Sequence, residues 1–222
     1  MDNNNSFIPY HHPEISQTEM LKRIQDFNAE MQKRRSLRMF SDRAVDRKII
    51  EEIISVAGSA PSGAHKQPWS FCAVSNREIK SKIREAAEKE EYENYHGRMS
   101  DEWMKDLEVF DTDWNKSFLE TAPWLIIIFK KAYDLNTSEE KSKNYYVNES
   151  VGIATGFLLT AIHQAGLVSL THTPSPMNFL HAILDRPDNE RAYLLIPVGY
   201  AAENAQVPDL KRKPLHEISK FY

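Results

Sequence analysis

The stretch from Ser150 to Leu184 contains no Asp, Glu, Lys or Arg, and this limits what the chain can fold into. A membrane-spanning helix needs about 20 consecutive apolar residues, whereas this stretch is interrupted by three glycines, by His163 with Gln164, and by two prolines. A segment interrupted in this way is poorly suited to form a membrane-spanning helix. We expect instead a helix from about Tyr146 to Ala165, buried on nearly all sides, with Gly166 as its C-terminal cap.

Apolar runs elsewhere predict the strands of a sheet. The run from Pro123 to Lys130 has the composition of a strand covered on both faces. Further strands are expected at residues 68–75, 167–171 and 193–198, and helices at 18–33, after Asp46 as far as Gly58, and from about Asn76. The predicted fold class is therefore α+β, with helices flanking a central mixed sheet.

Size and composition narrow the class of protein. A chain of 222 residues with 41% hydrophobic residues forms one packed domain, or one protomer of an intertwined oligomer. The net charge of −4 argues against a nucleic-acid binder, which needs a strongly positive face. Cys72 is the single cysteine, so an intrachain disulfide and a cysteine metal cluster are excluded. With no signal peptide in view, we expect a cytoplasmic protein that is not bound to a membrane.

The two ends of the chain differ from its middle. Residues 1–16 are expected to form an extended N-terminal arm, residues 17–222 the main domain, and residues from about 202 to 222 a C-terminal arm. Between Glu85 and Glu120, twelve acidic and four basic residues alternate with aromatic ones. Composition alone favours a solvated helical pair here, and the alternative is a mobile lid over about 88–118.

Arginines are concentrated in the segment Arg34-Arg35-Ser36-Leu37-Arg38, and a second basic run is Lys211-Arg212-Lys213. Arginine holds planar oxyanions through paired hydrogen bonds and keeps its charge, so these segments suit a phosphate. A solvated basic helix end is the alternative for the first segment taken alone. No P-loop or Rossmann glycine motif is present, and no His or Cys spacing indicates a metal site.

The order of several short motifs carries a family resemblance. The motifs are Arg34-Arg35-Ser36-x-Arg38, Ala60-Pro61-Ser62-Gly63-Ala64-His65-x-Gln67-Pro68-Trp69, Thr171-His172-Thr173-Pro174, Pro197-Val198-Gly199-Tyr200 and Val207-Pro208-Asp209-Leu210-Lys211-Arg212-Lys213-Pro214. Taken together, residues 30–216 resemble the FMN-dependent nitroreductase superfamily, and within it the iodotyrosine deiodinases. The resemblance implies a nitroreductase-like fold in an intertwined homodimer with exchanged terminal arms and FMN at the subunit interface.

The resemblance also implies which residues contact FMN. The residues expected to hold the phosphate, the ribityl chain and the ring edge are Arg34, Arg35, Ser36, Leu37, Arg38 and Arg212. Ser62, Thr171, His172 and Thr173 are expected to line the flavin, with Thr173 donating to its N5 atom as the catalytic contact. His172 stands where the family often has threonine.

For the substrate, the resemblance implies that a halotyrosine zwitterion is held by Glu91, Tyr95 and Lys116, with the Ala64 amide near the phenolate oxygen. Glu91 and Tyr95 are four residues apart, so they share a helical face. A carboxylate suits the ammonium group, while an ammonium and a phenol suit the carboxylate.

The implied reaction is reductive dehalogenation of iodo-, bromo- or chlorotyrosine to tyrosine and halide, with electrons from a nicotinamide such as NADPH or from a reductase. Animal members carry an N-terminal membrane helix, and we expect none here, so the resemblance is to the soluble bacterial type of the family. The alternatives are a broad nitroreductase or quinone reductase, a flavin-binding amino-acid sensor without turnover, and an α+β dimer that binds no flavin.

Overall fold

The computed structural model describes residues 7–135 and 140–222, and the chain divides into two compact units, one ending at Arg34 and one formed by Arg35–Tyr222. The first unit contains residues 7–16, without regular structure, and helix α1 (Gln17–Lys33). Ser16 caps this helix, since its hydroxyl accepts a hydrogen bond from the Glu19 amide at 3.2 Å. The first six residues of the expected N-terminal arm lie outside the described residues.

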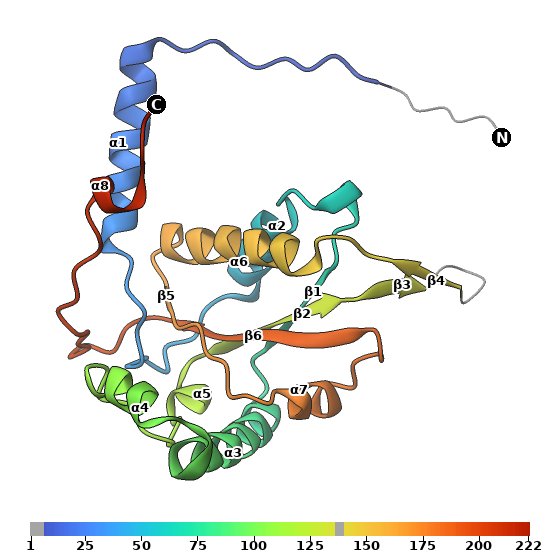
Figure 1. The fold of residues 1–222 in the computed structure, drawn as a ribbon, viewed down its shortest axis with the longest axis vertical. Coiled ribbons are helices and arrows are strands. Elements are labelled where there is room, and N and C mark those ends of the chain that lie inside the picture. The colour runs from blue at the N-terminus through green and yellow to red at the C-terminus, as the bar shows by residue number, and fades with distance from the viewer. Residues whose placement is uncertain (1–6, 136–139) are drawn as a thin grey trace. The chain divides into compact units, whose positions relative to one another are not determined.

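The second unit consists of a sheet with helices on both sides (Figure 1). Its helices are α2 (Arg47–Gly58), η1 (Gly63–His65), α3 (Arg77–Glu93), η2 (Asn94–Arg98), α4 (Asp101–Glu108), α5 (Phe118–Thr121), α6 (Val147–Gln164), α7 (Asn178–Ile183) and α8 (Leu215–Ile218). Its strands are β1 (Trp69–Val74), β2 (Trp124–Lys131), β3 (Tyr133–Leu135), β4 (Lys141–Lys143), β5 (Val168–Ser169) and β6 (Glu190–Gly199).

The main sheet has the strand order β1-β2-β6-β5, and each pairing between these strands is antiparallel. Among the described residues, the parallel part of the expected mixed sheet is an isolated bridge between Ser36 and Ser169. Strand β5 is shorter than the expected 167–171, because after Ser169 the regular ladder ends. The chain then contacts β6 through a hydrogen bond from the Leu170 amide to the Pro197 carbonyl, at 3.4 Å, and through a bridge between His172 and Leu195. Strands β3 and β4 form a separate hairpin.

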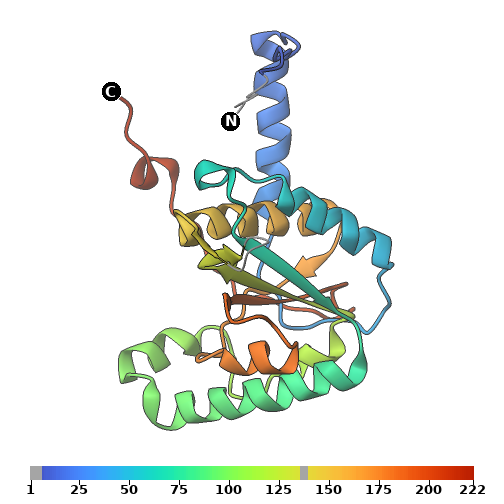
Figure 2. The same ribbon diagram turned by 90° about the vertical axis from the view of Figure 1, so that its right-hand side faces the viewer.

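Strand β2 separates two hydrophobic cores. Ile126 and Ile128 pack in the core that includes α2 and α6, whereas Ile127 and Phe129 pack in the core that includes α3, α5 and α7. Figure 2 shows α2 and α6 on one side of the sheet and α3 and α7 on the other. Successive side chains of a strand point to opposite faces, so an unbroken apolar run is what a strand between two cores requires. The prediction of a strand covered on both faces is confirmed.

Helix α6 is buried on one side only. Ala154 and Leu158 are fully buried, whereas Ile153 and Phe157 are 43% and 39% exposed. The expectation of burial on nearly all sides is therefore wrong for the single chain, because the contacts of α6 with α2 and the sheet account for only part of its apolar surface. Gly166 follows the helix with a φ of 74°, a conformation that favours glycine, as expected of its cap.

Helix α2 begins where the sequence predicts it. It follows Asp46, whose Oδ1 accepts a hydrogen bond from the Lys48 amide at 2.7 Å. After β6, residues 202–222 contain one short helix, α8, as their regular structure. No helix among the described residues is long and apolar enough to cross a bilayer.

Candidate functional site

A cavity of about 470 Å³ lies between the C-terminal end of α3, helix α4 and the segment after β5. Its lining combines charged and aromatic side chains, and consists of Arg38, Glu91, Asn94, Tyr95, Arg98, Met99, Trp103, Leu107, Thr112, Lys116, Phe118, Leu170, Thr171, His172, Thr173, Ser175 and Pro176. The cavity thus contains seven of the residues that the sequence singles out: Arg38, Glu91, Tyr95, Lys116, Thr171, His172 and Thr173.

Glu91 and Lys116 form a buried ion pair in the cavity wall. Lys116 Nζ lies 3.5 Å from Glu91 Oε2, and the two residues are 4% and 6% exposed, respectively. Lys116 Nζ also donates hydrogen bonds to Thr112 Oγ1, at 3.3 Å, and to the Asp113 carbonyl. The Tyr95 ring centre is 5.3 Å from the same ammonium, and the Tyr95 hydroxyl donates to the Thr112 carbonyl at 3.1 Å. The three residues expected to bind a zwitterion therefore lie together.

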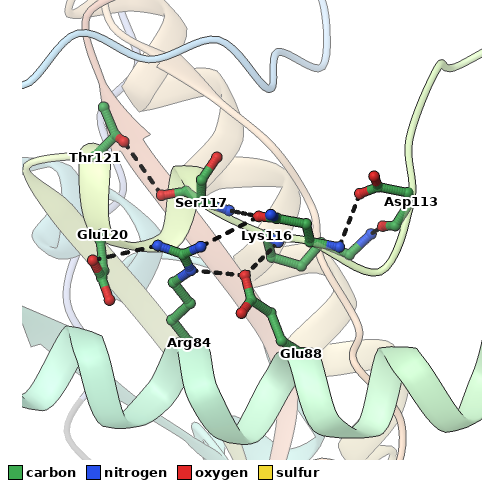
Figure 3. Close-up of polar contacts among 8 residues, drawn as sticks. Arg84, Glu88, Asp113, Lys116, Ser117, Glu120 and Thr121 are labelled. Atoms are coloured by element: carbon green, nitrogen blue, oxygen red, sulfur yellow. Dashed lines mark hydrogen bonds and ion pairs between the residues drawn. The ribbon is translucent and has the colours of Figure 1, made fainter.

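A second set of polar contacts attaches the loop that carries Lys116 to α3 (Figure 3). Glu88 Oε1 accepts hydrogen bonds from the Lys116 amide and from Arg84 Nε, both at 2.7 Å. Arg84 also donates to Asn115 Oδ1 at 3.3 Å and lies 3.5 Å from the Glu120 carboxylate. Because α3 also carries Glu91, these contacts set the position of Lys116 relative to its partner.

Burial opposes both charges of this ion pair. Desolvation raises the pKa of Glu91 and lowers the pKa of Lys116, while the opposite charge of each partner acts against these shifts. Burial also raises the pKa of Tyr95, so its hydroxyl keeps its proton and can donate. An ammonium near Glu91 and a carboxylate near Lys116 and Tyr95 would satisfy all three groups. The arrangement suits the zwitterionic end of an amino acid.

His172 projects a buried, unpartnered nitrogen into this group. Its Nε2 has no hydrogen-bond partner and lies 4.0 Å from Glu91 Oε1. Desolvation, with the positive charges of Lys116 and Arg38, lowers the pKa of His172 to about 3. The backbone amide and carbonyl of His172 are both paired with Leu195, at 2.9 and 3.0 Å. Any ligand contact of His172 through a hydrogen bond to Nε2 is therefore made by a neutral imidazole.

The first basic segment contributes to the cavity through Arg38. Its guanidinium lies 5.2 Å from the centre of the Phe110 ring, and burial lowers its pKa from a very high ordinary value. Leu37 is buried and donates its amide to the Ser169 carbonyl at 3.1 Å, so this amide serves the fold. Arg35 donates a hydrogen bond to the Pro208 carbonyl, which ties the basic segment to the chain that leads to Arg212.

Two of the expected site residues lie elsewhere in the second unit. Ser62 and Ala64 do not line the cavity; they belong to the turn containing η1. This turn adjoins the start of α6, because the Gly63 amide donates to Ser150 Oγ at 3.2 Å. Ala64 has a φ of 49°, which is unusual for a residue with a side chain. The turn and the cavity are thus on opposite sides of the sheet, where α6 and α3 lie.

Ser36 and two of the expected phosphate-binding arginines lie outside the cavity lining. Arg34 belongs to the first unit, while Ser36 and Arg212 are exposed and do not line the cavity. Their roles stay predictions. No group of three His, Cys, Asp or Glu side chains that could hold a metal ion occurs in residues 7–135 and 140–222.

The sequence-based prediction included Tyr95 of η2 but missed the other lining residues of η2 and those of α4. Asn94, Arg98, Trp103 and Leu107 line the cavity, and Asn94 Nδ2 donates to the Ser175 carbonyl at 3.0 Å across it. The spacing of Trp103 and Leu107, one helical turn apart, is the sequence signal that could have indicated an apolar face here. The segment is a helical pair, as its composition favours, and its inner side also forms a wall of the cavity.

Comparison with known proteins identifies the family of this chain. The protein-family model described as "Nitroreductase family" matches residues 31–200. The iodotyrosine deiodinase of Haliscomenobacter hydrossis is 60% identical over 217 residues, which are 98% of each chain. Iodotyrosine deiodinase 1 of Homo sapiens is 44% identical, over 98% of this chain and 75% of its own. A crystal structure of oxidized iodotyrosine deiodinase, bound to FMN and 3-iodo-L-tyrosine, matches with a TM-score of 0.74 at 26% identity, covering 88% of this chain and 100% of that one.

Proposed function

Because this chain belongs to the nitroreductase family and, within it, to the iodotyrosine deiodinases, we propose that it is an FMN-dependent oxidoreductase that dehalogenates halotyrosines. The substrates are iodo-, bromo- and chlorotyrosine, and the products are tyrosine and halide. The observation that carries the proposal is the meeting of Glu91, Tyr95 and Lys116 in one cavity with Arg38 and the Thr171–Thr173 turn.

The chemistry of the donor groups fits FMN. Arg38 at the cavity wall supplies a cation for the oxygen-bearing edge of the flavin ring, and the hydroxyl of Thr173 supplies a donor for N5. We assign the phosphate and ribityl chain to Arg34, Arg35, Ser36 and Arg212. The hydrogen bond from Arg35 to the Pro208 carbonyl supports this assignment, since it connects the two basic segments.

In the reaction, a carbon–halogen bond of the substrate is replaced by a carbon–hydrogen bond, which consumes two electrons and one proton and releases halide. Bound FMN in its reduced form supplies the electrons. The protein's own residues orient the substrate: Glu91 binds the ammonium, while Lys116 and Tyr95 bind the carboxylate. These interactions gain strength from the exclusion of water, which we assign to closure of residues 88–118 as a lid.

We further propose that the enzyme acts as a homodimer. Ile153, Phe157 and Ala161 follow one another along α6 at intervals of one turn, and Ala161 adjoins the exposed Ile49 and Val56 of α2. An exposed apolar face of this kind marks an association surface. The Ser62–Ala64 turn adjoins the start of the same helix through the hydrogen bond from Gly63 to Ser150, so we assign Ser62 and the Ala64 amide to the flavin and phenolate of the partner subunit's site.

The source of electrons is proposed to be a nicotinamide such as NADPH or a reductase. The cytoplasmic location also stays a proposal, supported by the lone, half-buried thiol of Cys72, whose pKa is raised by burial.

Anaerobic incubation of the dithionite-reduced, FMN-loaded protein with 3-iodotyrosine tests the function. We expect tyrosine and iodide in equal amounts, measured by chromatography and an iodide electrode. Tight binding of iodotyrosine without iodide would indicate a sensor. Reduction of a nitroaromatic without iodide release would indicate a general nitroreductase. Either result would overturn the proposal.

A further inference from the structure

Three buried side-chain atoms among the described residues have no hydrogen-bond partner: Asn144 Oδ1, His172 Nε2 and His181 Nε2. His172 is the one of these three residues that lines the cavity. A buried polar atom without a partner costs free energy comparable to a lost hydrogen bond, so a ligand that pairs with Nε2 regains that free energy on binding.

The surroundings of His172 determine what kind of group can pair with it. Glu91 faces it from α3, Lys116 from the loop before α5, and Arg38 from the first basic segment. Phe118 of α5 packs against the imidazole with its ring at 83° to it, and their centres are 5.6 Å apart. Burial and, to a lesser extent, the two cations keep the imidazole neutral, and a neutral imidazole can offer a lone pair at Nε2.

Two acceptors thus lie side by side in the cavity wall, Glu91 Oε1 and His172 Nε2, at a separation of 4.0 Å. A donor nitrogen that lies about 2.9 Å from each of two acceptors can bridge a pair about 4 to 5 Å apart. A primary ammonium has several N–H groups in a tetrahedral arrangement, so it can donate one to each acceptor. A guanidinium is planar and larger, and an alcohol has one proton only.

We propose that Glu91 Oε1 and His172 Nε2 together bind the α-ammonium of the substrate, which makes His172 a specificity-determining residue for a free primary amine. The inference rests on the proposed function, since it concerns the amino-acid end of the same substrate. It differs from the flavin contact that the family resemblance implies for His172. The backbone polar groups of His172 are paired with Leu195, so its side chain provides the polar contact to a ligand.

The test compares equilibrium binding of two ligands to the FMN-loaded protein: 3-iodotyrosine and its desamino analogue, 3-(3-iodo-4-hydroxyphenyl)propanoic acid. In His172→Met, which keeps the volume but loses the acceptor, affinity for 3-iodotyrosine falls about ten- to a hundredfold. Affinity for the desamino analogue changes less than about threefold. His172→Gln, which offers an amide oxygen, recovers part of the loss. His181→Gln, on α7 outside the cavity, is the matched control.

Equal weakening of both ligands in His172→Met, or weakened FMN binding alone, would overturn the inference and favour a packing or flavin role. If the unaltered protein binds no 3-iodotyrosine, the proposed function fails and the inference fails with it.

A second experiment uses the unaltered protein, so that its result does not depend on whether the variants fold. The ¹⁵N chemical shift of His172 Nε2 in the unaltered protein is expected to move on addition of 3-iodotyrosine and to stay in place with the desamino analogue. An identical response to both ligands overturns the inference.

Discussion

Lys116 Nζ lies 3.5 Å from Glu91 Oε2 in a wall of the cavity, and both residues are almost completely buried. Taking two charges out of water is costly, and mutual attraction at this separation recovers only part of the cost. The opposing shifts of the two pKa values, upward for Glu91 and downward for Lys116, reflect this desolvation. A zwitterion offers each partner a further charge of the opposite sign. The ammonium of an amino acid can therefore bind Glu91 while its carboxylate binds Lys116.

Neutral substitutions of this pair are expected to separate two activities. In Glu91→Gln or Lys116→Gln, one charge of the bound zwitterion loses its partner, which typically costs a few kcal/mol, so halotyrosine turnover should fall roughly a hundredfold or more. Turnover of a nitroaromatic that has no zwitterion should fall much less. Steady-state kinetics with both substrates measure the difference.

Glu93→Gln and Lys105→Gln are the matched controls, because both side chains are exposed and outside the cavity lining. They should leave both activities within about twofold of the original. An equal loss of the two activities in Glu91→Gln would show that the residue maintains the fold or the flavin site and does not select the substrate.

Local patterns were sufficient to predict most of the fold. The strand at Trp124–Lys131 and the helices after Asp46 and Asn76 are where periodicity and capping residues indicate them. The exposure of Ile153 and Phe157 on α6 was not predicted, because apolar content does not distinguish a residue buried in its own chain from one on an apolar surface that another chain can cover.

The candidate site was predictable only through motifs. Spacing places Glu91 and Tyr95 on one helical face, but no periodicity relates that face to Lys116 or to the Thr171–Thr173 turn. The tertiary contacts that unite them run through Glu88, which holds the Lys116 amide, and through the bridge of His172 with Leu195. The lining from α4 was missed for the same reason, since an amphipathic helix in an acidic segment shows an apolar side but not what it faces.

A charge on the outer face of α6 is expected to dissociate the proposed dimer. Phe157 is 39% exposed in the single chain, and Phe157→Glu would bury a carboxylate without a partner in a subunit interface, at a cost of several kcal/mol. Sedimentation velocity should show monomers at micromolar concentration, and FMN should be retained less well, because Ser62 of the partner subunit would no longer reach the flavin.

The control is Val109→Glu, which places the same charge on an exposed apolar residue beyond the C-terminal end of α4. It should leave the oligomeric state unchanged. A dimer that persists in Phe157→Glu with unaltered FMN binding would exclude the α6 face from the interface.

The neutral imidazole of His172 makes stability depend on pH in a predictable direction. Its pKa is lowered from 6.5 to about 3 in the folded chain, through burial and through the positive charges of Lys116 and Arg38. Between these two values the unfolded chain binds a proton that the folded chain does not, so stability is present above pH 6.5 and is lost as the pH falls toward 3. Glu91, whose pKa is raised, acts in the opposite direction, since its contribution declines as the pH rises.

Urea unfolding of the flavin-free protein at pH 7 and pH 5 measures how its stability depends on the protonation of His172. From pH 7 to pH 5, His172 should contribute a loss of up to about 2 kcal/mol in the free energy of unfolding. In His172→Gln this contribution disappears while that of Glu91 remains, so the variant should lose less stability than the original over the same interval, whatever its stability at pH 7. Equal losses in the two proteins would mean that His172 is protonated to the same extent in the folded and unfolded chains, and that its Nε2 is not the desolvated acceptor described above.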